Sequence, residues 1–447
     1  MRKLILGLLL AVGGCTVEPP IPQSVILISL DTLRADHLGI YGYDRPTSPN
    51  IDALAETGIV FEQALAQASS TLPSHRSLFR SRLPSKAVGP ETTLAEVLAA
   101  HGLKTAAFTG GGNVSAAFGF DQGFSSYVDD SRGFGRAFDA VEIWLRGHAE
   151  EPFFLFLHTY DIHLPYDPPA PYHEKFGAAY RGPVHGRGTL EILRQVRGFR
   201  GYKQDEDSLS LTDLDRTKIV DLYDGGILYT DTYIGRLLLL LRELGLREKT
   251  AVILFSDHGE EFWEHGSVLH SHTLYQELIH VPLIFSLPGN WQAGEHITQP
   301  VRLLDVAPTL LDLLQIPIPP TFEGRSLLSL MSGKAQEPVT IAAEIKDWRA
   351  RIDYPWKWIR RGYGSESQTE LFNLESDPME KHNLADQEPE LINRFSNSTE
   401  PKDRLELNPF VRHVDFEGVE GELRAQLEAL GYVDEAEEKS PAQTPDP

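Results

Sequence analysis

Six short apolar runs, rich in β-branched and aromatic residues, alternate with helical patterns along this chain. The first covers residues 24–30, and the others lie near residues 107, 155, 254, 284 and 342. A continuous apolar run is typical of a strand that is buried on both faces of a sheet. Helical patterns occupy 48–64, 92–102 and 220–245. This alternation predicts an α/β fold with a large, mainly parallel sheet that is covered by helices on both faces.

The composition excludes several classes of protein. The chain has 447 residues, of which 41% are hydrophobic, and a formal net charge of −23. The hydrophobic content is ordinary for a globular protein, and the length allows one large domain and a small one. The acidic balance argues against nucleic acid as a partner, because phosphate backbones need a basic surface. The single cysteine, Cys15, excludes an internal disulfide framework.

Residues 1–14 have the pattern of an export signal. Two basic residues precede a short apolar run, and Gly13 and Gly14 lie directly before Cys15. The run is too short to span a bilayer. Small residues before a cysteine resemble a bacterial lipoprotein signal, so lipidation is expected at Cys15. We therefore expect an exported protein, anchored by lipid to a bacterial membrane on its periplasmic or cell-surface side. The alternative is a short N-terminal helix of a cytosolic protein.

Carboxylates and a histidine follow two of the predicted strands. Asp31 ends the first strand, and Asp257 and His258 follow the strand near residue 254. Ligands bind at the carboxyl ends of strands in sheets of this type. Aspartate together with histidine is a suitable ligand set for a divalent metal. The alternative is that each aspartate caps the helix that follows it.

The segment SSTLPSHRS, residues 69–77, places three reactive side chains at the start of a predicted helix: Thr71, His75 and Arg76. Backbone N–H groups at a helix start attract anions. Thr71 can act as a nucleophile if metal coordination removes its proton. The alternative is an ordinary helix cap with a capping histidine.

Two segments are rich in histidine. His158, Asp161 and His163 lie within six residues of one another, in a Pro-rich loop. Residues 262–283 contain four more histidines: His265, His270, His272 and His280. Several histidines in one loop favour a binding site, although a surface histidine is the alternative for any one of them. His280 is expected to be structural, because it opens an apolar strand.

In their order along the chain, these segments resemble the sulfatase family of the alkaline phosphatase superfamily. The matching segments are 25–43, 48–64, 71–75, 161–169, 255–266, 272–284, 303–314 and 370–385. The resemblance implies an alkaline-phosphatase-like α/β/α sandwich with a small C-terminal sheet subdomain. It also implies metal-assisted cleavage of an anionic ester. Asp31, Asp257 and His258 match metal ligands of the family, and Thr71 matches the nucleophile.

Several positions depart from the sulfatase pattern. Sulfatases carry Cys or Ser at the position of Thr71, and that residue is oxidised to formylglycine, a conversion for which threonine is not a substrate. His75 stands where the motif arginine belongs, and Arg76 is displaced by one position. A Gly-rich segment with Asn113 replaces the lysine–histidine pair that binds sulfate. His272 replaces a further sulfate-binding lysine.

These departures resemble phosphatase, phosphodiesterase and phosphoethanolamine-transferase relatives, in which a Thr or Ser nucleophile bridges metals. One ion is expected to be held by Asp31, Thr71, Asp257 and His258. A second ion is expected to be held by Asp161, His163 and His272. Zn²⁺ or Mn²⁺ suits these mixed ligand sets, with Ca²⁺ or Mg²⁺ as alternatives. The other expected site residues are catalytic His75 and Arg76 and substrate-binding Asn113 and His158.

The sequence thus predicts an extracytoplasmic, metal-dependent hydrolase that cleaves a phosphate or sulfate ester, with phosphate favoured, through a threonine nucleophile. The expected partner is an anionic ester, such as a glycan or a phospholipid head group. The alternatives are a phosphoethanolamine-type transferase and a catalytically degenerate, glycan-binding lipoprotein. The expected parts are a signal (1–14), a tether (15–23), a catalytic domain (24–344), a small subdomain with a helix (345–433) and a disordered acidic tail (434–447).

Overall fold

A computed structural model of the chain describes residues 18–87, 89, 91–129, 133–177, 179–196, 209–362, 367–397, 421–430 and 432. The expected signal, Cys15 and the acidic tail lie outside the described residues. None of the helices in the described part is long and apolar enough to cross a membrane.

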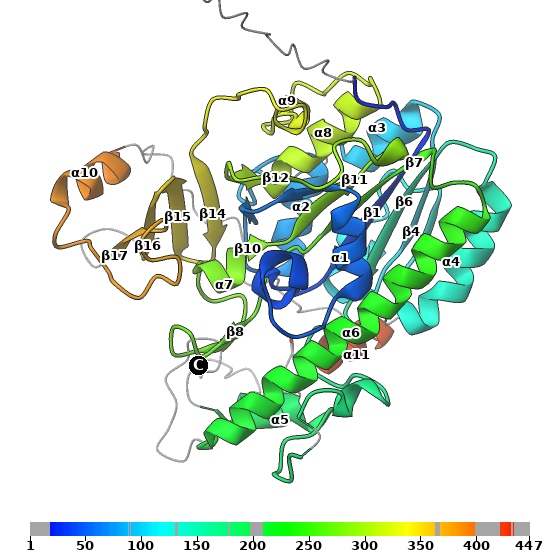
Figure 1. Cartoon of the computed structure of the whole chain (residues 1–447). Coiled ribbons are helices and arrows are strands. Elements are labelled where there is room, and N and C mark those ends of the chain that lie inside the picture. Colours follow the sequence, from blue (N-terminus) through cyan, green and yellow to red (C-terminus); the bar gives the residue numbers. More distant parts are fainter. Residues whose placement is uncertain are drawn as a thin grey trace, which may run out of the picture.

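An eight-stranded sheet forms the centre of the molecule (Figure 1). From one edge to the other its strands are β12 (Glu295–Ile297), β2 (Ile59–Phe61), β11 (Leu283–Ser286), β7 (Thr250–Phe255), β1 (Ser24–Leu30), β6 (Phe153–Thr159), β4 (Lys104–Phe108) and β5 (Ser126–Val128). β1 pairs in parallel with both β6 and β7. β11 is antiparallel to β7 and β2, so the sheet is mixed but mainly parallel. The predicted fold class is confirmed.

Helices cover both faces of this sheet (Figure 1). One layer contains α1 (Pro49–Glu56), α4 (Phe134–His148) and α6 (Asp213–Glu243), and the other contains α2 (Thr71–Arg80), α3 (Leu94–Ala100) and α8 (Val306–Leu313). Successive side chains of a strand point to opposite faces. Accordingly, Val25 and Leu27 of β1 belong to the core under α2, α3 and α8, whereas Ile26 and Ile28 belong to the core under α1, α4 and α6. The result is an α/β/α sandwich.

Short elements connect these layers. They are η1 (Ala35–His37), η2 (Gly39–Tyr41), β3 (Ala64–Leu65), η3 (Gly112–Val114), η4 (Ala116–Phe118), η5 (Tyr172–Glu174), α5 (Gly188–Arg194), β8 (Glu261–Phe262), β9 (Val268–Leu269), α7 (Gln276–Ile279), β10 (His280–Val281), η6 (Pro288–Asn290), β13 (Val301–Arg302), η7 (Leu303–Asp305) and α9 (Leu328–Met331). β10, β3 and β13 form a three-stranded sheet, and β8 pairs with β9.

A second, antiparallel sheet lies to the side of the large one, next to α7 (Figure 1). Its strands are β14 (Ile341–Ile345), β15 (Trp348–Asp353), β16 (Trp356–Arg361) and β17 (Gln368–Asn373). α10 (Pro389–Asn397) packs Phe395 against Trp358 and Leu371 of this sheet. The last described helix, α11 (Gly421–Ala429), returns to η3 of the main body. The expected small C-terminal sheet is confirmed.

Two expectations about individual elements are wrong. The helical pattern over 48–64 is a helix only as far as Glu56, and Ile59–Phe61 forms β2 of the central sheet. At the turn between them, a Cβ on Gly58 would lie 2.6 Å from the carbonyl oxygen of Phe285, so only glycine lets α1 and β11 approach this closely. The apolar run near residue 342 is β14, which pairs with β15 in the small sheet. Periodicity alone does not say which sheet a short apolar run joins.

A buried group of charged residues ties the small sheet to α7. Lys357 Nζ of β16 lies 2.7 Å from Glu380 Oε1, and both side chains are fully buried. The other carboxylate oxygen of Glu380 accepts the backbone N–H of Gln276 at 2.6 Å. His265 Nδ1 lies 2.6 Å from Glu277 Oε1, and its Nε2 lies 3.1 Å from the carbonyl oxygen of Glu380. Both ring nitrogens therefore face acceptors, which requires a charged imidazolium.

The same group contains His265, Glu277 and Glu380, a combination that resembles a metal site. Its charges are already balanced, because Lys357 and the imidazolium of His265 face the two carboxylates. Burial alone would lower the pKa of His265, but the hydrogen bond and charge of Glu277 raise it. We interpret this group as a structural ion-pair network.

Candidate active site

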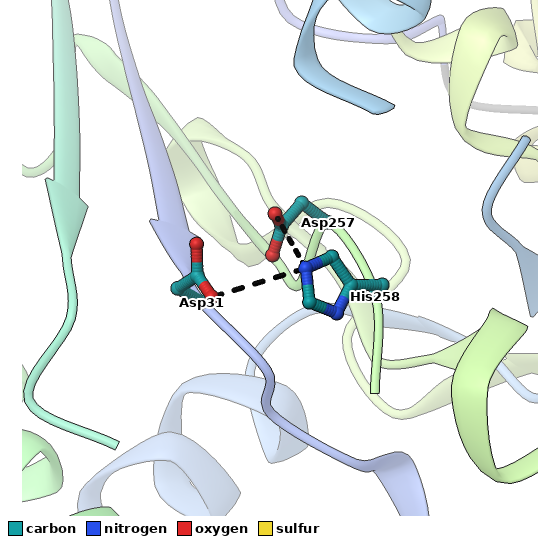
Figure 2. Close-up of side chains that lie close together, drawn as sticks. All are labelled: Asp31, Asp257 and His258. Carbon is teal, nitrogen blue, oxygen red and sulfur yellow. Dashed lines mark ion pairs between the residues drawn. The ribbon is translucent and has the colours of Figure 1, made fainter. Parts of the chain in front are cut away.

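Four of the predicted site residues meet at the carboxyl ends of the central strands. Asp31 directly follows β1, and Asp257 and His258 follow the neighbouring parallel strand β7. Figure 2 shows their three side chains pointing toward one another. Thr71, the first residue of α2, joins them, and all four side chains are fully buried. Parallel strands end at the same edge of a sheet, which explains why residues so distant in sequence meet here.

The distances within this group are those of a small polar cluster. His258 Nε2 lies 3.5 Å from Asp257 Oδ2 and 3.9 Å from Asp31 Oδ1 (Figure 2). The Thr71 hydroxyl donates to Asp31 Oδ2 at 3.1 Å, and its oxygen lies 3.2 Å from His258 Nε2. His258 Nδ1–H donates to the carbonyl oxygen of Gly259 at 2.9 Å. This contact leaves Nε2 as the ring nitrogen that faces the two carboxylates.

This cluster fits a divalent cation. Among the described residues, Asp31 Oδ1 and both carboxylate oxygens of Asp257 are buried without a hydrogen-bond donor. Burial raises the pKa of the Asp31 carboxyl to about 6. Burial, and next the charge of Asp31, raise the pKa of Asp257. A cation between the two carboxylates would reverse both effects and saturate the buried oxygens. One imidazole nitrogen with oxygen ligands suits Zn²⁺ or Mn²⁺.

His158 contacts Asp31 directly, although the sequence suggested that it binds substrate. Its Nε2 lies 3.2 Å from Asp31 Oδ2, and its Nδ1 accepts the backbone N–H of Gly110 at 3.4 Å. Burial lowers the pKa of His158 to about 4, so the imidazole is neutral. In this tautomer Nε2–H donates to Asp31. His158 therefore orients the Asp31 carboxylate.

His75 lies beneath the cluster on α2. Its Nδ1 lies 2.9 Å from the carbonyl oxygen of Thr71 and 3.5 Å from Asp257 Oδ2. Its Nε2 lies 2.9 Å from Ser29 Oγ. Burial lowers the pKa of His75 to about 4, so this histidine does not supply the positive charge of the arginine that it replaces. Its contacts position Thr71 and Asp257.

Arg76 does not reach this cluster, contrary to the expectation for a catalytic residue. Its Nη2 donates to the carbonyl oxygen of Phe118 at 3.1 Å. Residues four apart on a helix share a face, so His75 lies on the same side of α2 as Thr71. Each residue along a helix rotates the side-chain direction by about 100°, so Arg76, one residue after His75, points away from this side.

Asn113 lies close to the site, in η3. Its backbone N–H donates to the hydroxyl of Tyr160 at 3.2 Å. The ring of Tyr160 contacts His158 and His163, with centroid distances of 4.6 Å and 5.4 Å. Within the described part of the chain, Asn113 Oδ1 is buried and receives no hydrogen bond. Its predicted contact with substrate stays a prediction.

The three residues expected to hold a second metal do not come together. Asp161 accepts hydrogen bonds from the Phe134 backbone N–H and the Thr159 hydroxyl, both at 2.7 Å, and so caps α4. His272 Nε2 lies 2.7 Å from Glu261 Oε2, in a buried hydrogen bond. Of this set, His163 alone faces Thr71, across the hydroxyl of Tyr432. The predicted second ligand set is therefore wrong.

His270, rather than His272, faces Thr71, across the hydroxyl of Tyr432. Its ring lies 4.5 Å from the ring of His258, and its Nδ1 lies 2.8 Å from Glu260 Oε1. In an extended chain, His270 and His272 would point to the same side. Ser271 between them has a φ of 70°, in the left-handed region, and this turns the two side chains apart. Nothing in the residue types signals this conformation.

Tyr432 was not expected in the site at all. Its hydroxyl lies 3.1 Å from Thr71 Oγ1, 3.1 Å from His163 Nε2 and 3.2 Å from His270 Nε2. It is separated from Thr71 by 361 positions in the sequence. A contact over such a distance leaves no local pattern that could reveal it.

Comparison with known proteins gives two matching family models. Residues 23–316 match the family model described as "Sulfatase", and residues 264–399 match "N-sulphoglucosamine sulphohydrolase, C-terminal". Arylsulfatase K of Bos taurus is 30% identical over 285 residues, which cover 57% of this chain and 52% of that protein. The chain thus spans about half the length of this relative.

Solved structures share the fold. A phosphonate monoester hydrolase of Agrobacterium radiobacter aligns with a TM-score of 0.65 and 19% identity, covering 84% of this chain and 94% of that one. A 2-O GAG sulfatase aligns with a TM-score of 0.65 and 17% identity, covering 87% and 94%. The family model covers more than half of the sequence, and the strand-end cluster lies within it. The chain belongs to the sulfatase family.

Proposed function

We propose that this protein is a metal-dependent hydrolase that cleaves a phosphate ester, in preference to a sulfate ester, with Thr71 as the nucleophile. The observation that carries the proposal is the position of Thr71 Oγ1, 3.1 Å from Asp31 Oδ2 and 3.2 Å from His258 Nε2. A hydroxyl beside two ligands of a cation site is well placed to lose its proton. A bound cation supplies charge stabilisation, both for the alkoxide and for the group that is transferred.

The groups around Thr71 account for the steps of the proposed reaction. Thr71 opens α2, so the free N–H groups of that helix favour a negative charge beside its hydroxyl. After losing its proton toward Asp31, Oγ1 attacks phosphorus. The new Oγ1–P bond forms as the bond from phosphorus to the alcohol oxygen breaks, and the alcohol leaves with a proton. Water then hydrolyses the phosphothreonine and restores the hydroxyl.

Phosphate is favoured because of the residue type at position 71. The sulfatase reaction depends on a formylglycine made from Cys or Ser, and threonine is not converted. A threonine alkoxide can attack phosphorus without any such modification. Sulfate esters are the second candidate, because the Bos taurus relative is named arylsulfatase K. The name of the Agrobacterium radiobacter neighbour adds phosphonate monoesters to the phosphorus compounds to be assayed.

The test is a paired assay on protein loaded with Mn²⁺ or Zn²⁺. Aryl phosphate, aryl phosphodiester, aryl phosphonate and aryl sulfate with the same phenol are compared before and after chelation. We expect the phosphorus esters to have the higher kcat/KM, and chelation to remove all turnover. Faster cleavage of the sulfate would assign the protein to sulfate esters instead. Turnover that survives complete removal of metal would contradict the metal-dependent mechanism.

His270 is proposed to protonate the leaving alcohol. Its Nε2 contacts the Tyr432 hydroxyl, which borders Thr71 Oγ1. Glu260 lies against its Nδ1, which fixes the ring and leaves Nε2 directed at the oxygen position beside Thr71 Oγ1 that the Tyr432 hydroxyl fills. A proton on Nε2 can pass to the alcohol oxygen as its bond to phosphorus breaks.

The His270→Ala variant should lose activity in proportion to the basicity of the leaving group. We expect kcat/KM to fall about 10²- to 10⁴-fold for an alkyl phosphate, because its alkoxide needs a proton. The loss for a nitrophenyl phosphate should be much smaller, because that phenolate leaves unaided. The matched control is His272→Gln, in the same loop but paired with Glu261. An equal loss for both leaving groups would show that His270 is not the proton donor.

We further propose that the protein is exported and anchored to a bacterial membrane through a lipid on Cys15. The export-signal pattern directly before Cys15 supports this. In the Cys15→Ala variant, the protein should move to the soluble fraction or keep its uncleaved signal, since the lipid is the proposed anchor. Membrane fractionation and the mass of the mature N-terminus measure this. Processed Cys15→Ala protein that still sediments with membranes would exclude a lipid anchor.

A further inference from the structure

The helix α11 packs against the glycine loop 110–112, and this contact forms the seat of the helix on the main body. Gln426 Oε1 of α11 accepts the backbone N–H of Gly112 at 3.0 Å, and the side chain of Leu427 is fully buried. A Cβ on Gly111 would lie 2.5 Å from Gln426 Oε1, and one on Gly112 would lie 2.8 Å from Leu430 Cδ1. Both glycines have a positive φ. The shape of this loop therefore suits the seat of α11, in the place where sulfatases carry a lysine–histidine pair.

The seat of α11 brings Tyr432 to the nucleophile. The backbone N–H of Tyr432 donates to the carbonyl oxygen of Leu427 at 2.9 Å, which turns the chain back after the helix. The phenol then lies over α2, where three groups from separate segments, Thr71, His163 and His270, surround its hydroxyl at 3.1–3.2 Å. Three polar groups that converge on one oxygen atom form an oxygen-binding subsite.

This subsite lies on the side of Thr71 Oγ1 from which a substrate has to approach. Asp31 and His258 are the other polar side chains that contact Thr71 Oγ1 in the described part of the chain, and both belong to the cation site. A reacting atom has to come within about 3–3.5 Å of the nucleophile. The Tyr432 hydroxyl, at 3.1 Å, is already within that range.

We propose that Tyr432 is a tethered occupant of the substrate's oxygen subsite, so that α11 has to leave the glycine loop before an ester can reach Thr71. The proposal rests on the assignment of Thr71 as the nucleophile. Tyr432 imitates an oxygen of the anionic group, and the C-terminal segment competes with substrate. The described seat is small, with one hydrogen bond from Gly112 and the apolar contacts of Leu427 and Leu430, so that a ligand can displace it.

Binding of inorganic phosphate to the Mn²⁺-loaded protein, measured by calorimetry, tests this without turnover. An occupant that fills the subsite nine-tenths of the time raises the apparent Kd about tenfold. Tyr432→Ala should therefore lower the Kd for phosphate by about this factor. Gln426→Ala, which loosens the seat but does not touch the subsite, should shift the Kd in the same direction. The control is Glu422→Ala, an exposed position of the same helix, whose Kd should equal that of the unchanged protein.

The opposite result would overturn the proposal. Weaker phosphate binding in both Tyr432→Ala and Tyr432→Phe would make Tyr432 a substrate-binding group, and an unchanged Kd would show that it does not compete. This outcome differs from failure of the proposed function. In that case no ester is turned over by any variant, while the effect of Tyr432→Ala on phosphate binding remains.

Discussion

The Thr71→Ala variant should lose about 10⁴-fold or more in kcat/KM for a phosphate ester, because removal of a nucleophile ends the covalent pathway. The methyl group that replaces the side chain is small, and the backbone of α2 is unchanged. The thermal unfolding transition and the amount of soluble protein should therefore stay close to those of the unchanged protein. Steady-state kinetics, with circular dichroism as the folding control, measures both.

The matched control for this change is Thr71→Ser, which keeps the hydroxyl. It should retain activity within about tenfold, because the nucleophilic oxygen remains next to Asp31 and His258. Rapid quenching of a reaction with labelled phosphate ester should trap the label on Thr71 in the unchanged protein and none in Thr71→Ala. If Thr71→Ala keeps more than a few per cent of the activity, Thr71 is only a helix residue and another group carries the reaction.

The Lys357→Met variant should reduce the free energy of unfolding by about 3–5 kcal/mol, the usual effect of breaking a buried ion pair by removing one partner. Lys357 and Glu380 are both fully buried and lie 2.7 Å apart. Without the lysine, Glu380 keeps its hydrogen bond from Gln276 but has an uncompensated buried charge, and burial already raises the pKa of this carboxyl. Urea unfolding, followed by the fluorescence of the tryptophans, is the measurement.

The double variant with Lys357→Met and Glu380→Gln separates charge from packing. It should recover most of the lost stability, because the neutral amide can still accept the N–H of Gln276. Lys334→Met, at an exposed position, is the surface control and should change the stability by no more than about 0.5 kcal/mol. If Lys357→Met is as stable as this control, the buried pair does not hold the small sheet to α7. A metal effect on the unfolding of Lys357→Met would instead support an ion at Glu277 and Glu380.

The candidate cation site could be predicted from sequence because regular structure places its members. Asp31 and Asp257 both come within two residues of the ends of parallel strands, and Thr71 begins a helix. In these positions, the strand or helix fixes where a side chain lies before any packing is known. The large sheet was predictable for the same reason, since apolar runs buried on both faces have few alternatives.

The directions of the loop histidines near Thr71 could not be assigned in this way. His163, His270 and His272 lie in irregular segments, where one left-handed residue, such as Ser271, changes the direction of its neighbours. The two segments contain six histidines. In the folded protein, His163 and His270 face Thr71, whereas His272 contacts Glu261.

By itself, then, the sequence determined the α/β class and the placement of Asp31, Asp257 and His258 at strand ends, because these depend on local structure and its periodicity. It was the resemblance of its motifs to the sulfatase family that implied Thr71 as the fourth member of the cluster. The tertiary structure alone decided that Tyr432 enters the site and that the glycine loop 110–112 is its seat. Contacts between segments so far apart depend on how complete elements pack. That packing depends on the shapes and buried surfaces of the whole molecule, so it cannot be inferred from a short segment of sequence.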